Sequence, residues 1–366
     1  MNIYFDNAAT TPPLPCLQNF HANPSSPHLL GIAAERELYA ARSTLSNMLN
    51  VTPAEITFTS GGTESNNLAL IGYALANRRK NTTFVAAPWE HPSILEPLRF
   101  IQEQQLGNVI ITPVENYQPI PDTPTLVAFS HVNHETGDIA DIAVIAKRLK
   151  SALSQTIVLV DGVQGFCKEP LETSNIDMLS LSAHKCHGST GVGALMAKKH
   201  VRLLPLMHGG GQEQKLRPGT ENLAGITHFA RTAVGLHKQQ NTHHSHVSDI
   251  KAVLAEIATT LPGVHINAIS ANTTPYILNL SFVGLKGEIL VHTLSQRGIH
   301  ASMGAACQSR KKVTTTLEHM GFSAERAASA VRFSFSHLNT VEEATAAKAT
   351  IIECVNQMRK VLGVKL

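Results

Sequence analysis

The chain has 366 residues, of which 43% are hydrophobic and 16% are charged, and its formal net charge is +3. This length suits two domains, and the composition indicates a soluble globular protein with a large core. The small charge argues against binding to nucleic acid, and the lack of an apolar run of roughly 18 residues argues against a membrane protein. Five widely spaced cysteines indicate reduced thiols. Together with the absence of a signal pattern at the amino terminus, they predict a cytoplasmic protein.

Strand-like and helix-like patterns alternate along the first part of the chain. Helical spacing of apolar residues predicts helices at 29–50, 64–77, 94–105 and 139–153. Apolar or β-branched runs predict strands at 56–59, 84–87, 109–112, 126–130, 157–160, 178–182 and 192–197. Near-continuous apolar strands joined by helices predict an α/β fold with a mostly parallel central sheet covered by helices.

The pattern changes after the glycines at 209–211. A helix predicted over 222–239 runs into the polar stretch 240–246, which indicates a linker at a domain boundary. His243 and His246 within it could share a helix face and bind a metal ion. No carboxylate or thiol completes such a set, so we predict no metal site.

The last part of the chain predicts a smaller α+β domain. Its expected strands are 277–282 and 330–334, and its expected helices are 287–297 and 342–362. The predicted domains are therefore a large one at 14–245 and a small one formed by 1–13 and 246–366.

One lysine stands in a turn between two predicted strands, in the stretch Ser182-Ala183-His184-Lys185. It is either a solvated lysine at the tip of a loop or an amine held in place for covalent chemistry. Ser182 and His184 lie beside it, and the small residues that follow leave room for a ligand. An amine so placed can form a Schiff base with the aldehyde of pyridoxal phosphate (PLP). That cofactor also requires an acid for its pyridine nitrogen and a cradle for its phosphate.

Two other stretches meet these requirements. Ser60-Gly61-Gly62-Thr63-Glu64 lies between a strand and a helix, where the glycines let the backbone approach an anion or simply form a turn. Asp161 ends an apolar strand, where sheets of this kind bind ligands, and it can keep the pyridine nitrogen protonated or cap a helix. Gln164 follows three residues later and can hydrogen-bond the ring oxygen or cap a turn.

Two further residues have alternative roles. His91 follows a predicted strand, where an imidazole can lie over a cofactor ring and move protons, or serve the structure alone. Arg332 lies in an apolar strand-like run, where a guanidinium needs an anionic partner. That partner is either a substrate α-carboxylate or a carboxylate of the protein.

Cys307 differs from the other four cysteines in its surroundings. It lies in a stretch rich in Gly, Ala and Ser (303–309), followed by Arg310-Lys311-Lys312. Small residues suit a loop that visits a cofactor and then an acceptor, and adjacent cations favour the thiolate. The basic run is equally consistent with a solvated face. The remaining cysteines fit buried, inert thiols.

Together these stretches resemble the cysteine desulfurases, which are PLP enzymes of fold type I related to the class V aminotransferases. The similarity follows the same order along nearly the whole chain. The matching stretches are Phe5-Asp6-Asn7-Ala8-Ala9-Thr10-Thr11-Pro12, Asn23-Pro24-Ser25-Ser26 with His28, Thr59-Ser60-Gly61-Gly62-Thr63-Glu64-Ser65-Asn66-Asn67, Glu90-His91, Asp161 with Gln164, Ser182-Ala183-His184-Lys185, Gly209-Gly210-Gly211-Gln212-Glu213, Arg217 with Gly219-Thr220, Gly304-Ala305-Ala306-Cys307 and Arg332.

The resemblance implies how the cofactor would be held. Lys185 would bind it covalently and move protons, Asp161 and Gln164 would contact its ring, and His91 would stack on it. Thr220 would reach the phosphate of the neighbouring subunit, which implies a homodimer. The phosphate ligands within the chain would be Gly62, Thr63, Ser182 and His184.

The resemblance also implies the reaction. Arg332, with Asn23 and Ser25, would bind the carboxylate of L-cysteine. Cys307 would attack the substrate sulfur, which leaves alanine and a persulfide that passes to an acceptor protein. The acceptor and the pathway, such as iron–sulfur cluster assembly or tRNA thiolation, stay open.

Two features depart from the family pattern. The run Gln308-Ser309-Arg310-Lys311-Lys312 after Cys307 is more basic than expected, which leaves the sulfur acceptor open. The second departure lies at the cofactor. The family usually has Asn-Asn-Glu where this chain has Asn133-His134-Glu135, so His134 replaces the asparagine that donates to the phenolic oxygen of the cofactor. Imidazole is bulkier and titratable, which leaves the reaction preference open. The alternatives are another class V enzyme (an aminotransferase or a selenocysteine lyase) or a non-catalytic relative. A nucleotide-binding module would rest on Gly61-Gly62 alone.

Overall fold

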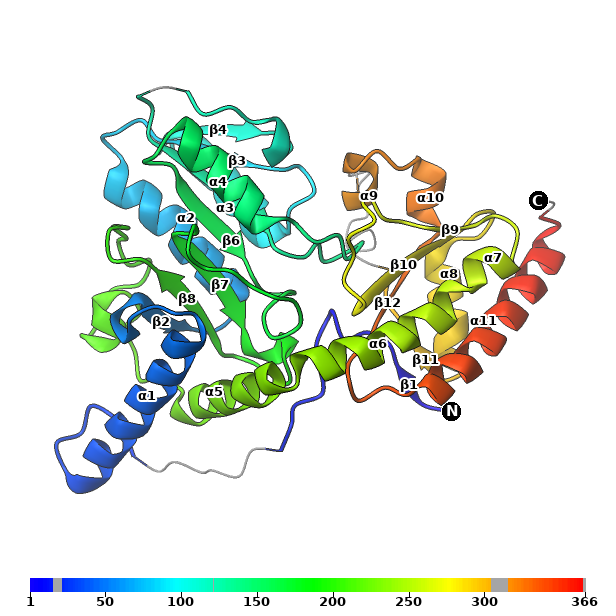
Figure 1. The fold of residues 1–366 in the computed structure, drawn as a ribbon, viewed down its shortest axis with the longest axis horizontal. Helices are drawn as coiled ribbons and strands as arrows, with labels where there is room; N and C mark the ends of the chain where they lie inside the picture. Colours follow the sequence, from blue (N-terminus) through cyan, green and yellow to red (C-terminus); the bar gives the residue numbers. More distant parts are fainter. Residues whose placement is uncertain (16–21, 121, 304–314, 365–366) are drawn as a thin grey trace. The chain divides into compact units, whose positions relative to one another are not determined.

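A seven-stranded sheet forms the centre of the larger of the two units into which the chain divides (Figure 1). The structure is a computed structural model that describes residues 1–15, 22–120, 122–303 and 315–364. The larger unit consists of Pro12–His131 and Ala140–Lys238. Its strand order is β2-β8-β7-β6-β5-β3-β4; the last five run parallel, and β8 is antiparallel to both of its neighbours. These strands are β2 (Ile56–Thr59), β3 (Thr83–Ala86), β4 (Asn108–Ile111), β5 (Thr125–Ser130), β6 (Ile157–Asp161), β7 (Met178–Ser182) and β8 (Gly193–Ala197).

Strand β5 shows why this sheet is covered on both faces. Val127 and Phe129 join one apolar cluster, and Leu126 and Ala128 join another. Because side chains alternate along a strand, a strand that is apolar at every position needs helices on both sides. One cluster includes residues of α1 (Leu29–Met48), α4 (Ile142–Ala152) and α5 (Leu223–Lys238), and the other includes residues of α2 (Gly62–Asn77) and α3 (Pro92–Glu103). The predicted α/β fold with a mostly parallel sheet is confirmed.

The smaller unit consists of Met1–Thr11, Val132–Ile139 and Gln239–Leu366. The segment Val132–Ile139 groups with this unit, although the predicted boundaries place it in the larger domain. The unit has an antiparallel sheet in the order β12-β10-β9 and a parallel pair, β1 with β11. Its strands are β1 (Ile3–Tyr4), β9 (Val264–Ile266), β10 (Ile277–Phe282), β11 (Ile299–His300) and β12 (Ala330–Ser334). Its helices are α6 (Gln240–Ala255), α7 (Ile257–Thr260), α8 (Gly287–Gln296), α9 (Thr316–His319), α10 (Ala324–Ala328) and α11 (Val341–Leu362).

The division between the two units falls beside the polar stretch 240–246, at Lys238 and Gln239, as predicted, but the stretch itself is not a linker, so that part of the prediction was wrong. It forms the first turns of α6, whose Val247, Ile250 and Leu254 are fully buried in the core of the smaller unit. The burial of this apolar face stabilises the helix despite its polar start. Nε2 of His246 lies 2.8 Å from the carbonyl oxygen of Asn339. In the described part of the chain, no group of three or more His, Cys, Asp or Glu side chains is placed to hold a metal ion.

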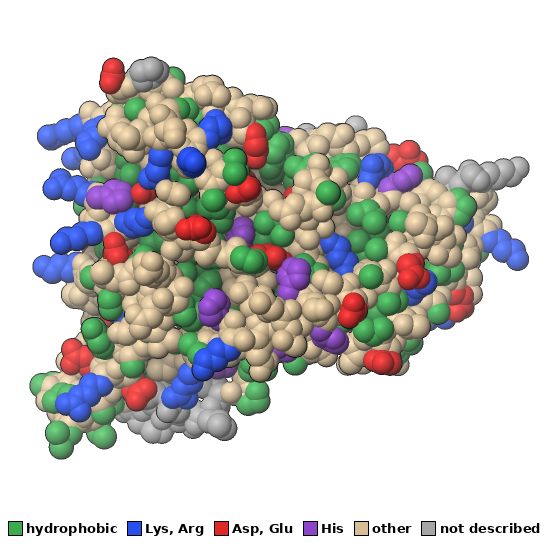
Figure 2. All heavy atoms as spheres, viewed as in Figure 1, with side chains coloured by type: hydrophobic (Ala, Val, Ile, Leu, Met, Phe, Trp, Pro, Cys, Tyr) green, Lys and Arg blue, Asp and Glu red, His purple; other side chains and the backbone are tan. Residues whose placement is uncertain are grey.

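The surface of the larger unit carries many basic side chains. Figure 2 shows Lys and Arg gathered along one edge of this unit. Basic residues also line a cavity of about 540 Å³ that includes Ile157, the first residue of β6. Asp161 is at the other end of that strand, so the cavity and the candidate site lie at opposite ends of β6.

Within the described ranges, no helix is both long enough and apolar enough to span a membrane.

Candidate active site

Lys185 lies in a tight turn directly after a central strand, as predicted. Strand β7 ends at Ser182, and Ala183–Lys185 form one 3-10 turn. Ser182 is 3% exposed, and its Oγ has no hydrogen-bond partner among the described residues. Lys185 and His184 are half-buried. Burial, helped by the charge of Lys185, lowers the pKa of His184 to about 4, so this imidazole is neutral at physiological pH.

The amino end of α2 lies beside Ser182. Gly61 precedes this helix and provides no side-chain cap, so the first N–H groups of the helix are available to an anion. A Cβ on Gly62 would lie 2.5 Å from Cγ2 of Val163, so only glycine fits there without displacing Val163. A Cβ on Gly61 would lie 3.7 Å from Oγ of Ser182. An uncapped helix terminus next to a buried hydroxyl fits the phosphate group of PLP.

Asp161 is the last residue of β6 and is 6% exposed. Its Oδ1 accepts a hydrogen bond from the N–H of Val163 at 2.9 Å, and its Oδ2 accepts one from Nδ2 of Asn66 at 2.7 Å. Gln164, in the turn that follows, is also buried. A carboxylate that is fixed by two donors at the carboxyl end of a parallel strand fits the pyridine nitrogen of PLP.

His91 is the N-cap of α3. Its Nδ1 accepts a hydrogen bond from the N–H of Ser93 at 3.1 Å and lies 2.8 Å from Oγ of the same residue. Nδ2 of Asn66 donates to this Oγ at 2.8 Å. Hydrogen bonds thus connect Asp161, Asn66, Ser93 and His91.

Sequence reasoning assigned no role to Asn66 or Ser93. Asn66 stands four residues after Gly62, and this spacing puts both on one face of a helix. That signal was available in the sequence. No comparable signal exists for Ser93, because its partner Asn66 is 27 positions away in the chain.

Glu90 is a buried carboxyl group next to His91, at 5% exposure. Its Oε2 accepts hydrogen bonds from the backbone N–H of Ser130, at 3.0 Å, and from the hydroxyl of Ser130. Burial raises the pKa of Glu90 to about 8, and the charge of Asp161 adds to this rise, while the Ser130 hydrogen bonds oppose it. Glu90 therefore keeps its proton at physiological pH.

Substituting Glu90 with glutamine is expected to flatten the pH dependence of stability. The unfolded carboxyl group loses its proton near pH 4.5, whereas the folded one keeps it to about pH 8. Between these values the folded state binds more protons, so the free energy of unfolding falls as pH rises, by up to about 1.4 kcal/mol per pH unit. Urea unfolding at several pH values should show this slope for the wild type and a shallower one for Glu90→Gln. Glu96→Gln, in which an exposed carboxyl group on α3, the helix that follows Glu90, is changed, should keep the wild-type slope. Equal slopes for all three proteins would contradict the raised pKa assigned to Glu90.

His131 follows β5 and packs against the turn that contains Gln164. It is 2% exposed, and burial lowers its pKa to about 4, so the imidazole is neutral. A Cβ on Gly165 would lie only 2.2 Å from Nδ1 of His131. The ring and the turn therefore touch at a point where only glycine fits.

Substituting Gly165 with alanine is expected to destabilise the protein by about 1 to 3 kcal/mol, because the methyl group would overlap the His131 ring. Gly235→Ala is the matched control. Gly235 lies within α5, and a Cβ there would meet no atom within 4 Å. Alanine favours helices, so the control should leave stability unchanged or raise it by up to about 1 kcal/mol. Urea unfolding of both variants measures the change in the free energy of unfolding. A Gly165→Ala variant as stable as wild type would show that the His131 ring can move aside.

The segment that leads to Thr220 is held by a buried ion pair. Glu213, with a side chain that is 1% exposed, pairs with Arg42 at 2.5 Å and accepts a hydrogen bond from the N–H of Phe58 at 2.8 Å. Glu213 and the next two residues have φ values of 46°, 56° and 68°, an unusual run of left-handed residues other than glycine. Nε of Arg217 then donates to Glu64 on α2 at 3.0 Å. Thr220 is exposed.

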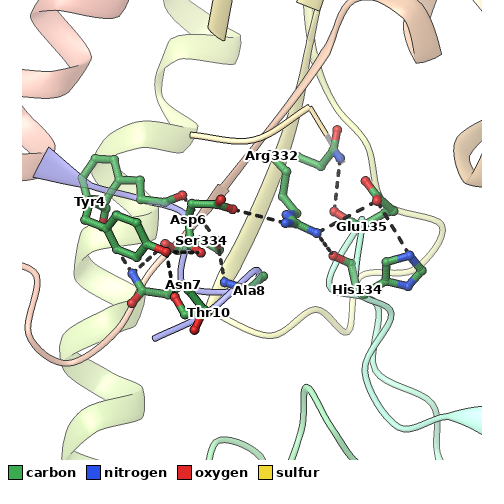
Figure 3. A network of polar contacts seen from close by, with 11 residues as sticks. Tyr4, Asp6, Asn7, Ala8, Thr10, His134, Glu135, Arg332 and Ser334 are labelled. Atoms are coloured by element: carbon green, nitrogen blue, oxygen red, sulfur yellow. Dashed lines mark hydrogen bonds and ion pairs between the residues drawn. The ribbon is translucent and has the colours of Figure 1, made fainter. Parts of the chain in front are cut away.

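Arg332 lies on β12 in the smaller unit and is 6% exposed (Figure 3). Its Nη1 donates to the carbonyl oxygen of His134 at 2.7 Å, and its Nη2 pairs with Oδ1 of Asp6 at 3.3 Å. Oε1 of Glu135 lies 4.0 Å from Nη1 and 3.7 Å from Nε2 of His134. The guanidinium therefore has carboxylate partners within the protein, and its Nε has no hydrogen-bond partner among the described residues.

Two other candidates lie on an exposed loop. Asn23 and Ser25 precede α1, and Oδ1 of Asn23 accepts a hydrogen bond from the N–H of Ser25 at 2.9 Å. Cys307 lies outside the described residues. Among those described, Cys167, Cys186 and Cys354 are free and buried. Burial, together with a hydrogen bond to Cys186, raises the pKa of the Cys167 thiol, which makes it unreactive.

Comparisons with known proteins place the chain in a family. Residues 3–346 match the aminotransferase class-V family. The chain is 36% identical over 382 residues to a NifS/IcsS protein homolog of Lactobacillus delbrueckii subsp. bulgaricus, an alignment that covers 98% of each. It is 31% identical over 358 residues to cysteine desulfurase IscS 1 of Archaeoglobus fulgidus, with 93% of each covered. A solved NifS-like protein, 31% identical, has a TM-score of 0.89 over 98% of this chain and 100% of its own. The chain therefore belongs to the class-V aminotransferase family, and within it to the cysteine desulfurases.

Proposed function

We propose that this protein is a PLP-dependent cysteine desulfurase that converts L-cysteine to L-alanine and carries the sulfur as a persulfide on Cys307. The observation that supports this most directly is the arrangement at the ends of two adjacent parallel strands. Strand β6 ends at Asp161, which two donors hold in place, and β7 leads into the turn that contains Lys185. An acid for the ring nitrogen and an amine for the aldehyde are thus held by neighbouring strands of one sheet.

The chain offers a ligand for each part of the cofactor. When bound, PLP supplies an electron sink for the bonds around the α-carbon of an amino acid. Asp161 would hold the pyridine nitrogen, and Gln164 would contact the ring oxygen. Lys185 would hold the aldehyde carbon and move protons at its Nζ, while His91 would lie over the ring. The phosphate ligands would be Gly62, Thr63, Ser182 and His184, and His134 would take the place of the usual asparagine near the phenolic oxygen.

Substrate binding would depend on Arg332, with help from Asn23 and Ser25. The buried guanidinium is held by His134 and Asp6, and its Nε, which has no hydrogen-bond partner among the described residues, is a donor left for the carboxylate of L-cysteine. The Cys307 thiolate would then attack the substrate sulfur. A sulfur–sulfur bond forms and the Cβ–S bond breaks; the carbon skeleton keeps the electron pair, takes up a proton and leaves as alanine.

A homodimer is the assembly that we propose, with Thr220 of one subunit at the phosphate of the other. Exposed apolar side chains on α1 support it: at the amino end Leu29 is 84% exposed and Leu30 66%, and in the middle of the helix Tyr39 is 63% exposed. Figure 2 shows hydrophobic side chains on the surface at this end of the larger unit. Such a patch on a protein of this size indicates a protein interface. We further propose a cytoplasmic location and an acceptor protein for the sulfur, as in iron–sulfur cluster assembly.

The function is tested by incubating the purified, PLP-loaded protein with L-cysteine. We expect alanine to form, and a mass increase of one sulfur atom on Cys307 in the intact protein. An aminotransferase would instead release a keto acid, and a selenocysteine lyase would release alanine only from selenocysteine. Protein that forms no coloured complex with PLP, or no alanine from L-cysteine, would contradict the proposal.

A further inference from the structure

The hydrogen bonds around His91 have a definite direction. Asp161, when ionised, only accepts, so one N–H of the Asn66 amide points to its Oδ2 at 2.7 Å. The other N–H of the same amide points to Oγ of Ser93 at 2.8 Å. Because Oγ already accepts this hydrogen bond, the Ser93 hydroxyl is free to donate its own proton to Nδ1 of His91, 2.8 Å away.

The backbone adds a second donor to the same nitrogen. The N–H of Ser93 points to Nδ1 of His91 at 3.1 Å, because His91 caps α3. A ring nitrogen that accepts from two donors carries no proton of its own. The neutral imidazole of His91 therefore has its proton on Nε2.

We propose that Ser93 is a positioning residue that, together with Asn66, fixes His91 in the Nε2–H tautomer and connects its orientation to Asp161. The proposal rests on the proposed function in one respect, namely that His91 lies over the cofactor and moves protons. In this arrangement His91 presents a proton rather than a lone pair at Nε2. The carboxylate that would bind the ring nitrogen and the imidazole that would stack on the ring are then held by a single amide, that of Asn66.

A purely structural role for Ser93 would look different. The side-chain cap of α3 comes from Nδ1 of His91, and the Ser93 hydroxyl instead connects α3 to Asn66 on α2. Ser93 and Asn66 are 6% and 0% exposed, so water does not compete for these bonds. If the hydroxyl only joined the two helices, its removal would change stability and leave the protonation of His91 unchanged.

The experiment combines NMR of histidine nitrogens with kinetics, on the PLP-loaded protein. Two-bond proton–nitrogen spectra of histidine-labelled protein should show a bare Nδ1 and a protonated Nε2 for His91, identified by the signals that disappear in His91→Gln. In Ser93→Ala, Nδ1 keeps only the longer bond from the backbone N–H, at 3.1 Å, which favours the Nε2–H tautomer less strongly, so these signals should shift towards a mixture of tautomers. The turnover number should fall about 10-fold, as for one lost hydrogen bond at a proton-transferring group, with KM changed by less than about 2-fold.

Two further variants separate positioning from folding. Ser93→Thr keeps the hydroxyl and should restore both the signals and the turnover number to within about 3-fold of wild type. Ser46→Ala is the matched control, because Ser46 is fully buried and its hydroxyl donates to a helix carbonyl oxygen at 3.0 Å, on α1. It should leave His91 and turnover unchanged.

Either of two results would overturn the inference. One is a wild-type protein with the proton of His91 on Nδ1; the other is a Ser93→Ala variant with wild-type signals and turnover. The NMR result does not depend on desulfurase activity, so a PLP-binding protein that catalyses a different reaction would leave this test intact.

Discussion

Substitution of Lys185 with alanine is expected to reduce alanine formation from L-cysteine by about 10⁴-fold. The side chain has two tasks, since it holds the cofactor covalently and moves protons during turnover, and proton transfer by a positioned group alone contributes about 10² to 10⁴. The turn Ala183–Lys185 follows directly on a buried central strand, which fixes the backbone that carries this amine. Initial rates of alanine release at saturating L-cysteine measure the effect.

The same variant should also lose covalent retention of PLP. Borohydride treatment of wild-type protein should leave a cofactor adduct on Lys185, which mass spectrometry of the peptides detects, and Lys185→Ala should show none. Lys199→Ala, in which an exposed lysine of the same unit is changed, should keep both the adduct and the rate. If Lys185→Ala kept the rate, the covalent role assigned to this lysine would be wrong.

Substitution of Cys307 with alanine is expected to abolish both the persulfide and alanine formation from L-cysteine. The thiolate is the nucleophile that takes the sulfur, and without it the Cβ–S bond has no acceptor. Intact-protein mass spectrometry after incubation with L-cysteine, together with alanine release, measures both. Cys16→Ala is the control and should behave as wild type.

The Cys307 variant also distinguishes the remaining alternatives. A lyase that eliminates selenium or sulfur without a protein nucleophile would keep its turnover in Cys307→Ala. An aminotransferase would keep its keto-acid production. Of the functions considered, only a cysteine desulfurase would lose alanine release in this variant while it retains PLP binding.

Much of the larger unit could be predicted from the sequence because its signals are local. Each strand of the central sheet is a short apolar run, and Asp161 is recognisable as the first polar residue after such a run. Lys185 is recognisable by its position between two such runs. Near-continuous apolar strands then allow only a sheet covered on both faces.

The contacts that complete the site could not be read in this way. Asn66 and Asp161 are 95 positions apart, and nothing in either local pattern pairs them. The stretch 240–246 was misassigned for a related reason. Its polar residues resemble a linker, but the apolar face that makes α6 a helix starts only at Val247. The role of Cys307 as persulfide carrier remains a prediction. The contact of Thr220 with the phosphate in a second subunit also remains a prediction.

The Arg42–Glu213 pair protects one edge of the central sheet against aggregation at high protein concentration. Strand β2 pairs only with β8 among the described strands, so its other side is an open edge of the sheet. Arg42 donates to the carbonyl oxygen of Ile56 at 2.5 Å, and Glu213 accepts from the N–H of Phe58. Two backbone groups that a strand from another molecule would bind are thus already engaged. We therefore expect this edge to resist the strand-to-strand aggregation that unprotected sheet edges promote.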